Sequence, residues 1–93
     1  MNRDMAKTLA GEALSFLASD LERLGRFLAL TGVDPKEIRA LARDPAFLAA
    51  VLEHVLSEPS LLQSFVSDTE CSAADVAAAH AALGGRPWER DVP

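Results

Sequence analysis

The sequence predicts an all-α protein, a compact bundle of five or six short helices, and three observations carry this prediction. Tyrosine is absent, and β-branched residues are few beside many alanines and leucines, a composition that favours helix over strand. Apolar residues recur at helical spacing, and Asp, Ser, Pro and Gly mark where helices would begin and end. With 93 residues, 49% of them hydrophobic and 25% charged, the chain is one small globular domain.

The first half divides into helices expected near residues 4–18, 20–31 and 35–43. The second helix follows a capping box, Ser19-Asp20-Leu21-Glu22, in which we expect the Ser19 hydroxyl to cap the helix, and it stops at Gly32. The third begins at Asp34-Pro35 and is polar except for Ile38 and Leu41, through which it should cover the core. The apolar stripe predicted for the second helix consists of Leu21, Leu24, Phe27, Leu28 and Leu30.

The second half divides into helices expected near residues 45–57, 59–69 and 73–83, which start at Asp44-Pro45, at the weaker Glu58-Pro59 signal and at Ser72. The last helix is rich in alanine, which predicts burial on more than one side. The domain is expected to span residues 1–85, and the polar tail 86–93, with two prolines, is expected to fray. The stripe predicted for the fourth helix consists of Phe47, Leu48, Val51, Leu52, Val55 and Leu56.

The same pattern recurs at an offset of 38 positions. Phe27 corresponds to Phe65 at this offset, and Thr31 corresponds to Thr69. A duplicated unit would produce this match, with repeats near 9–43 and 47–84, although any two helical hairpins of similar length align in part. The duplication predicts two three-helix units, packed face to face about a pseudo-twofold axis, neither of which buries its apolar face alone.

The net charge of −5 counts against a general nucleic-acid binder. Residues 1–43 hold seven bases and six acids, whereas residues 44–85 hold six acids and no Lys or Arg. Complementary halves would steer self-association or attract a basic partner. The alternative is that the bases simply solvate one face, because surface pairs contribute little to stability.

The compartment is predicted from one cysteine and from the absence of targeting patterns. Cys71 has no partner for a disulfide within the chain, which fits a reducing compartment. The first residues lack the long apolar stretch of a secretion signal, and the longest apolar run, Ala46 to Leu52, is too short to cross a membrane. We therefore expect a cytoplasmic protein that does not use a membrane.

No pattern in the chain predicts catalysis or a cofactor. Cys71 with His54 or His80 would be the candidate nucleophilic site, but Cys71 follows Glu70 rather than a base and is expected to be a small buried hydrophobe. We expect His54 at the boundary of the core and His80 near a helix C-terminus. The spacings of metal-ligand and phosphate-binding motifs are missing, so the prediction is no enzyme, no metal and no cofactor.

The leading functional hypothesis is a small non-enzymatic protein-interaction or adaptor module that binds an unidentified protein partner or forms a homodimer. The residues predicted to contact a partner are Trp88, Arg86, Arg90, Arg23 and Arg26. Trp88 would either anchor a partner or fold back into its own core. The alternative hypothesis is a DNA-binding helix-turn-helix regulator that uses residues 24–43, and a pocket for a small ligand is a third.

Four segments resemble one small bacterial family, a domain of unknown function. They are Ala13-Leu14-Ser15-Phe16-Leu17-Ala18, Leu24-Gly25-Arg26-Phe27-Leu28-Ala29-Leu30-Thr31-Gly32, Asp44-Pro45-Ala46-Phe47-Leu48 and Ala82-Leu83-Gly84-Gly85. The resemblance covers most of the chain. It implies a short all-helical cytoplasmic protein and supplies no activity, substrate or catalytic residue.

Overall fold

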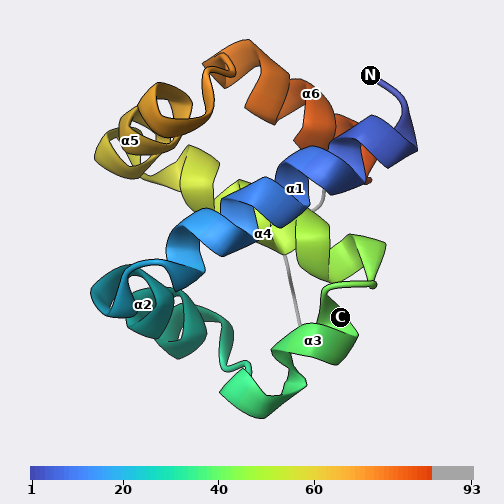
Figure 1. The fold of residues 1–93 in the computed structure, drawn as a ribbon. Coiled ribbons are helices and arrows are strands. Elements are labelled where there is room, and N and C mark those ends of the chain that lie inside the picture. Colours follow the sequence, from blue (N-terminus) through green and yellow to red (C-terminus); the bar gives the residue numbers. More distant parts are fainter. Residues whose placement is uncertain (85–93) are drawn as a thin grey trace.

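Two long helices, α1 (Arg3–Ala18) and α4 (Pro45–Ser57), cross at the centre of the molecule. Figure 1 shows α2 (Leu21–Thr31) and α3 (Ile38–Leu41) on one side of this pair, and α5 (Pro59–Thr69) and α6 (Ala73–Ala82) on the other. The structure is a computed structural model that describes residues 1–84, and this part contains six α-helices and no β-strand. The predicted all-α fold is confirmed.

The helix predicted at 35–43 is not continuous. A 3-10 turn (Pro35–Glu37) leads into the single α-helical turn of α3, and the Asp34 carboxylate accepts the Lys36 N–H at 2.9 Å. Short helices depend on packing, and of this segment Ile38, Leu41 and Ala42 pack against the core and are only partly buried. The segment therefore stays short, whereas the fourth and fifth helices have the predicted bounds.

The cap of α2 differs from the prediction. The Asp20 carboxylate accepts the N–H groups of Glu22 and Arg23 at 2.9 and 3.3 Å, while the Ser19 hydroxyl donates to the Phe16 carbonyl at 2.7 Å. Ser19 thus closes the end of α1, and Asp20 is the N-cap of α2 because its carboxylate is the stronger acceptor. By contrast, the box at Ser72 and Asp75 forms as predicted, with both bonds at 3.0 Å.

The core is centred on α4, which is buried on nearly every side by its neighbours. Its eight buried residues extend beyond the predicted stripe to alanines and to His54. The predicted stripe of α2 is wrong at its ends, because Leu21 is 85% exposed and Leu30 is 67% exposed, and only Phe27 is fully buried. The last helix is also less buried than predicted. It turns Val76 and Ala79 inward and leaves Ala73, Ala74, Ala77, Ala78 and Ala81 exposed.

Aromatic contacts recur at the predicted offset. The Phe16 ring packs edge-to-face on Phe65 at 5.4 Å between centroids, and the His54 ring packs on Phe27 in the same manner at 5.2 Å. At the offset of 38, Phe16 corresponds to His54 and Phe27 corresponds to Phe65. A pseudo-twofold rotation that places each unit on the other would therefore turn the contact between Phe16 and Phe65 into the contact between His54 and Phe27.

Hydroxyl contacts at the helix ends recur in the same way. Ser19 donates to the carbonyl of Phe16 at 2.7 Å, and Ser57 donates to the carbonyl of His54 at 2.8 Å. The Thr31 hydroxyl, at the end of α2, donates to the Phe27 carbonyl at 2.8 Å. The Thr69 hydroxyl, at the end of α5, donates to the Phe65 carbonyl at 2.7 Å. These contacts recur at the same offset, and the duplication itself stays a prediction.

Candidate functional site

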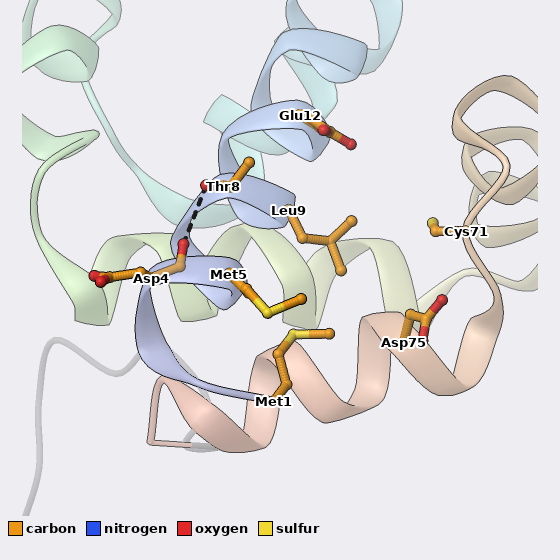
Figure 2. Close-up of a pocket in the computed structure, with 8 residues that line it drawn as sticks. All are labelled: Met1, Asp4, Met5, Thr8, Leu9, Glu12, Cys71 and Asp75. Atoms are coloured by element: carbon orange, nitrogen blue, oxygen red, sulfur yellow. Dashed lines mark hydrogen bonds between the residues drawn. The ribbon is translucent and has the colours of Figure 1, made fainter.

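A groove of about 440 Å³ runs along the surface between the first turns of α1 and the start of α6. Figure 2 shows the side chains of Met1, Met5 and Leu9 gathered between these two helices. Leu9 is 9% exposed and forms the floor, while Met1 and Met5 are 49% and 58% exposed. The remaining residues of the lining are Asp4, Thr8, Glu12, Cys71 and Asp75.

Local sequence explains how α1 presents this surface. Met5 and Leu9 are four positions apart on α1, so they share one face of the helix, and Met1 precedes the helix. Asn2 caps the helix by accepting the Met5 N–H at 2.8 Å, and the Thr8 hydroxyl donates to the Asp4 carbonyl at 3.1 Å. The cap orders the first turn, which holds Met5 beside Leu9.

The border of the groove is acidic. Asp4, Glu12 and Asp75 line it, and none of these carboxylates forms an ion pair with a base within residues 1–84. Asp75 also accepts the Ser72 N–H in the capping box that begins α6. The groove therefore combines adaptable apolar side chains with carboxylates that form no ion pair within the described residues. A larger depression nearby, about 730 Å³, contains no exposed large hydrophobic residue.

Cys71, expected to be a small buried hydrophobe, packs against the core but is only half-buried, and it lies at the edge of the groove. Its Sγ lies 3.1 Å from the Thr69 hydroxyl, since the chain turns sharply between α5 and α6. Within the described residues, no hydrogen bond or ion pair joins Cys71 to either histidine.

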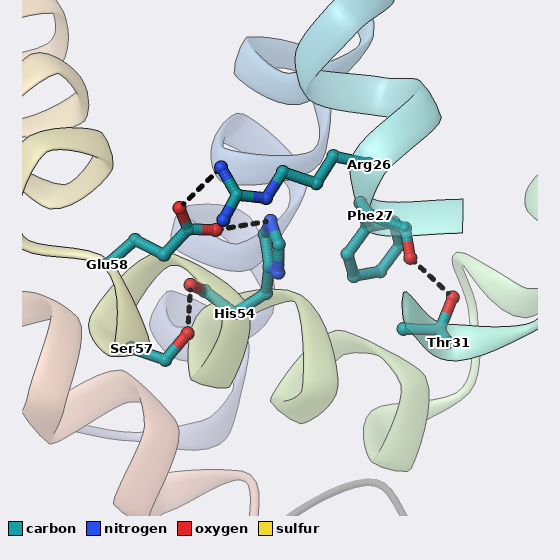
Figure 3. Close-up of polar contacts among 6 residues, drawn as sticks. All are labelled: Arg26, Phe27, Thr31, His54, Ser57 and Glu58. Atoms are coloured by element: carbon teal, nitrogen blue, oxygen red, sulfur yellow. Dashed lines mark hydrogen bonds and ion pairs between the residues drawn. The ribbon is translucent and has the colours of Figure 1, made fainter. Parts of the chain in front are cut away.

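A second polar cluster lies where α2 meets α4. His54 is 8% exposed and stacks on Phe27, so its predicted place at the boundary of the core is wrong. The Nε2 atom of His54 lies 3.7 Å from one oxygen of Glu58, and Arg26 Nη1 lies 3.1 Å from the other (Figure 3). His54 is buried because α4 is surrounded, and Glu58, which does not cap α5, serves as its polar neighbour.

The surroundings of His54 disfavour its charged form. Burial lowers the pKa of His54 below its ordinary value of 6.5, Glu58 opposes the effect, and Arg26 adds to it. His80 is near the C-terminus of α6, as predicted, and its Nε2 lies 2.7 Å from Glu53 without the alignment of a hydrogen bond. Each histidine thus faces a glutamate rather than a thiol.

The predicted partner contacts are dispersed. Arg23 lies over the Phe16 ring, 4.4 Å from its centroid, and Arg26 pairs with Glu58, so both guanidinium groups on α2 have partners within the chain. Trp88, Arg86 and Arg90 lie outside the described residues. The sequence analysis did not predict the groove. The signal that could have indicated it is the spacing of four between Met1, Met5 and Leu9, with Asp4 and Glu12 close by.

Neither a membrane span nor a metal-binding cluster occurs within residues 1–84. No helix there is both long enough and apolar enough to span a bilayer. No group of three or more His, Cys, Asp or Glu side chains in this part of the chain is arranged to hold a metal ion.

The described residues thus form a small all-helical fold with a methionine-lined surface groove. The chain belongs to the family described as "Protein of unknown function (DUF3572)", whose sequence model matches residues 3–86. The predicted membership of a family of unknown function is confirmed, and the match spans all six helices. No curated protein and no solved structure matches this chain.

Proposed function

We propose that this protein is a non-enzymatic interaction module that binds a basic protein segment in the groove between α1 and α6. The observation that carries the proposal is the pair of exposed methionines in a groove lined by three acidic residues that form no ion pair within residues 1–84. Exposed apolar side chains grouped in a concave surface mark binding sites. A partner that carries Arg or Lys around one large apolar side chain matches both the floor and the border.

The groove suits a weak and adaptable contact. Methionine is unbranched and polarizable, so Met1 and Met5 would repack around anchors of different shape. Charges at an exposed border contribute little to affinity, but they speed association and select the sign of the partner. We infer a transient complex in the cytoplasm, a compartment that the single free cysteine supports.

Selection from a displayed peptide library on the immobilised full chain tests the proposal. We expect enriched peptides to combine an aromatic or large aliphatic residue with Arg or Lys. Met5→Asp should abolish their binding, because it places a charge on the apolar side of the groove. Leu21→Asp is the matched control, since Leu21 is 85% exposed on α2, away from the groove. Equal binding to both variants, or no enrichment, would contradict the proposal.

The DNA-binding alternative has less support. A helix-turn-helix reader lays its second helix in the major groove, with several side chains reaching bases. In the segment 24–43 that second helix is α3, four residues long, after a 3-10 turn. Such a short helix presents few side chains to a duplex, so the interaction module is the better-supported function.

A further inference from the structure

We infer that the groove between α1 and α6 also receives this chain's own C-terminal segment, residues 85–93, through Trp88. The inference rests on the proposed function, because it names an occupant of the same groove. In the free protein this segment would occupy the groove, and a protein partner would have to displace it. Three features of the chain support the assignment. They are the length of the segment, the placement of its charged residues and the apolar side chains at the floor of the groove.

The described part of the chain ends close to the methionine end of the groove. Helices α1 and α6 run in opposite directions, so the end of α6 lies beside the start of α1, where Met1 and Met5 project (Figures 1 and 2). Trp88 is the fourth residue after Gly84. A fully extended stretch of four residues reaches about 14 Å. Trp88 can therefore reach the methionine end of the groove within its own chain.

The charges of the two surfaces are compatible. Glu12 and Asp75 lie on the groove side, whereas the Asp4 carboxylate points away from Met5 and Leu9 (Figure 2). Arg86 and Arg90 flank Trp88 at two residues on either side, and Pro87 favours an extended backbone at Arg86. In an extended segment these three side chains project from one face, while Glu89 and Asp91 project from the other. One arginine would then lie near Glu12.

The floor suits an indole ring. Tryptophan offers the largest apolar surface of any side chain, and sulfur atoms of methionine make favourable contacts with aromatic rings. Met1 and Met5 supply two such sulfur atoms above the Leu9 floor. Exposed ion pairs alone would be too weak to hold the segment, so the ring is the anchor and the arginines set its direction.

Intrinsic fluorescence of the full chain tests this inference directly, because Trp88 is the only tryptophan and tyrosine is absent. We expect short-wavelength emission and protection from acrylamide in the wild type. Met5→Asp should shift the emission to longer wavelength and increase quenching, while the control Leu21→Asp should leave both unchanged. Light scattering at the same concentrations should show a monomer, as intramolecular docking requires.

A second measurement uses a labelled peptide of residues 85–93. If the tail fills the groove about nine-tenths of the time, the peptide should bind the full-length Trp88→Ser variant about tenfold more tightly than the wild type. Equal affinities, solvent-exposed emission in the wild type, or protection that Met5→Asp leaves intact would each overturn the inference. Protection that appears only as dimers form would also overturn it, because the tail would then dock on a second copy.

The two proposals fail in different ways. If displayed peptides still bind through Met5 while Trp88 is fully quenched in the wild type, the interaction module stands and the tail is not its competitor. If no displayed peptide binds even in the Trp88→Ser background, the proposed function fails, whatever the fluorescence shows.

Discussion

Glu70 closes α5 with a left-handed backbone, φ 59°, which is unusual for a residue with a side chain. The equivalent position, 38 residues earlier, is Gly32, which closes α2 at φ 72°. Glycine adopts this conformation without a steric penalty. Glu70 also places negative charge at the C-terminal end of a helix, where the dipole disfavours it. The second unit thus carries strain that the first avoids.

Replacing Glu70 with glycine should therefore stabilise the protein. We expect Glu70→Gly to raise the free energy of unfolding by about 1 kcal/mol, because it relieves the left-handed strain. Glu70→Gln removes the charge and keeps the strain, so its gain should be smaller. Urea denaturation followed by circular dichroism measures both. Equal gains in the two variants would assign the effect to charge alone.

His54 should make stability depend on pH. Its pKa is lowered in the folded protein, chiefly by burial, so the unfolded chain binds a proton more readily than the folded chain. Stability is then greatest above the ordinary pKa of 6.5 and is lost as the pH falls through the folded value. Thermal unfolding between pH 7.5 and about 5 measures this loss.

The matched variant for this prediction is His54→Phe, which carries the residue found at the equivalent position 16. It keeps a ring against Phe27 and removes the titration, so its stability should change less over the same pH range. His80→Gln should retain the contribution of His54. A wild-type loss no steeper than that of His54→Phe would contradict the assignment.

At the scale of elements, the difference between α2 and α4 shows what a helical pattern predicts and what it leaves open. Both helices carry leucines at helical spacing, and both form near their predicted bounds. The spacing of apolar residues along a helix does not indicate how many other helices pack against it. Because α4 is surrounded and α2 lies at the periphery, Leu52 is fully buried and Leu21 is 85% exposed.

Two identical substitutions should therefore have very different costs. Leu52→Ala should lower the free energy of unfolding by about 2 to 5 kcal/mol, because it leaves a cavity in the core. Leu21→Ala should change it by less than about 0.5 kcal/mol, since the side chain is already in solvent. Chemical denaturation of the two variants makes the comparison. Similar losses would show that α2 is buried by something outside the described residues.

At the scale of the whole molecule, the interface between the two sequence units is the core itself. Helix α1 belongs to the first unit and α4 to the second, and their buried side chains form one cluster with those of α6. Neither unit retains this cluster when separated, because each would expose the face that the other covers. The duplication prediction thus has a physical consequence that can be measured.

Fragments 1–43 and 44–93 should each be largely unfolded alone and should gain helix when mixed. Far-ultraviolet circular dichroism of each fragment and of the equimolar mixture measures the gain. A mixture in which one fragment carries Phe16→Asp or Val55→Asp should show no gain, since both positions are buried. A fragment that melts cooperatively by itself would contradict the prediction.

The sequence alone determined the fold class, most helix bounds and the 38-residue correspondence, because capping and helical periodicity are local effects written within a few residues. The sequence also marked both histidines and the isolated cysteine, but it placed His54 wrongly and did not indicate the groove. Burial of His54 depends on helices distant in the chain, and the groove arises only where the start of α1 meets α6. Only tertiary packing decides which apolar residues meet each other and which, like Met5, stay exposed on the surface.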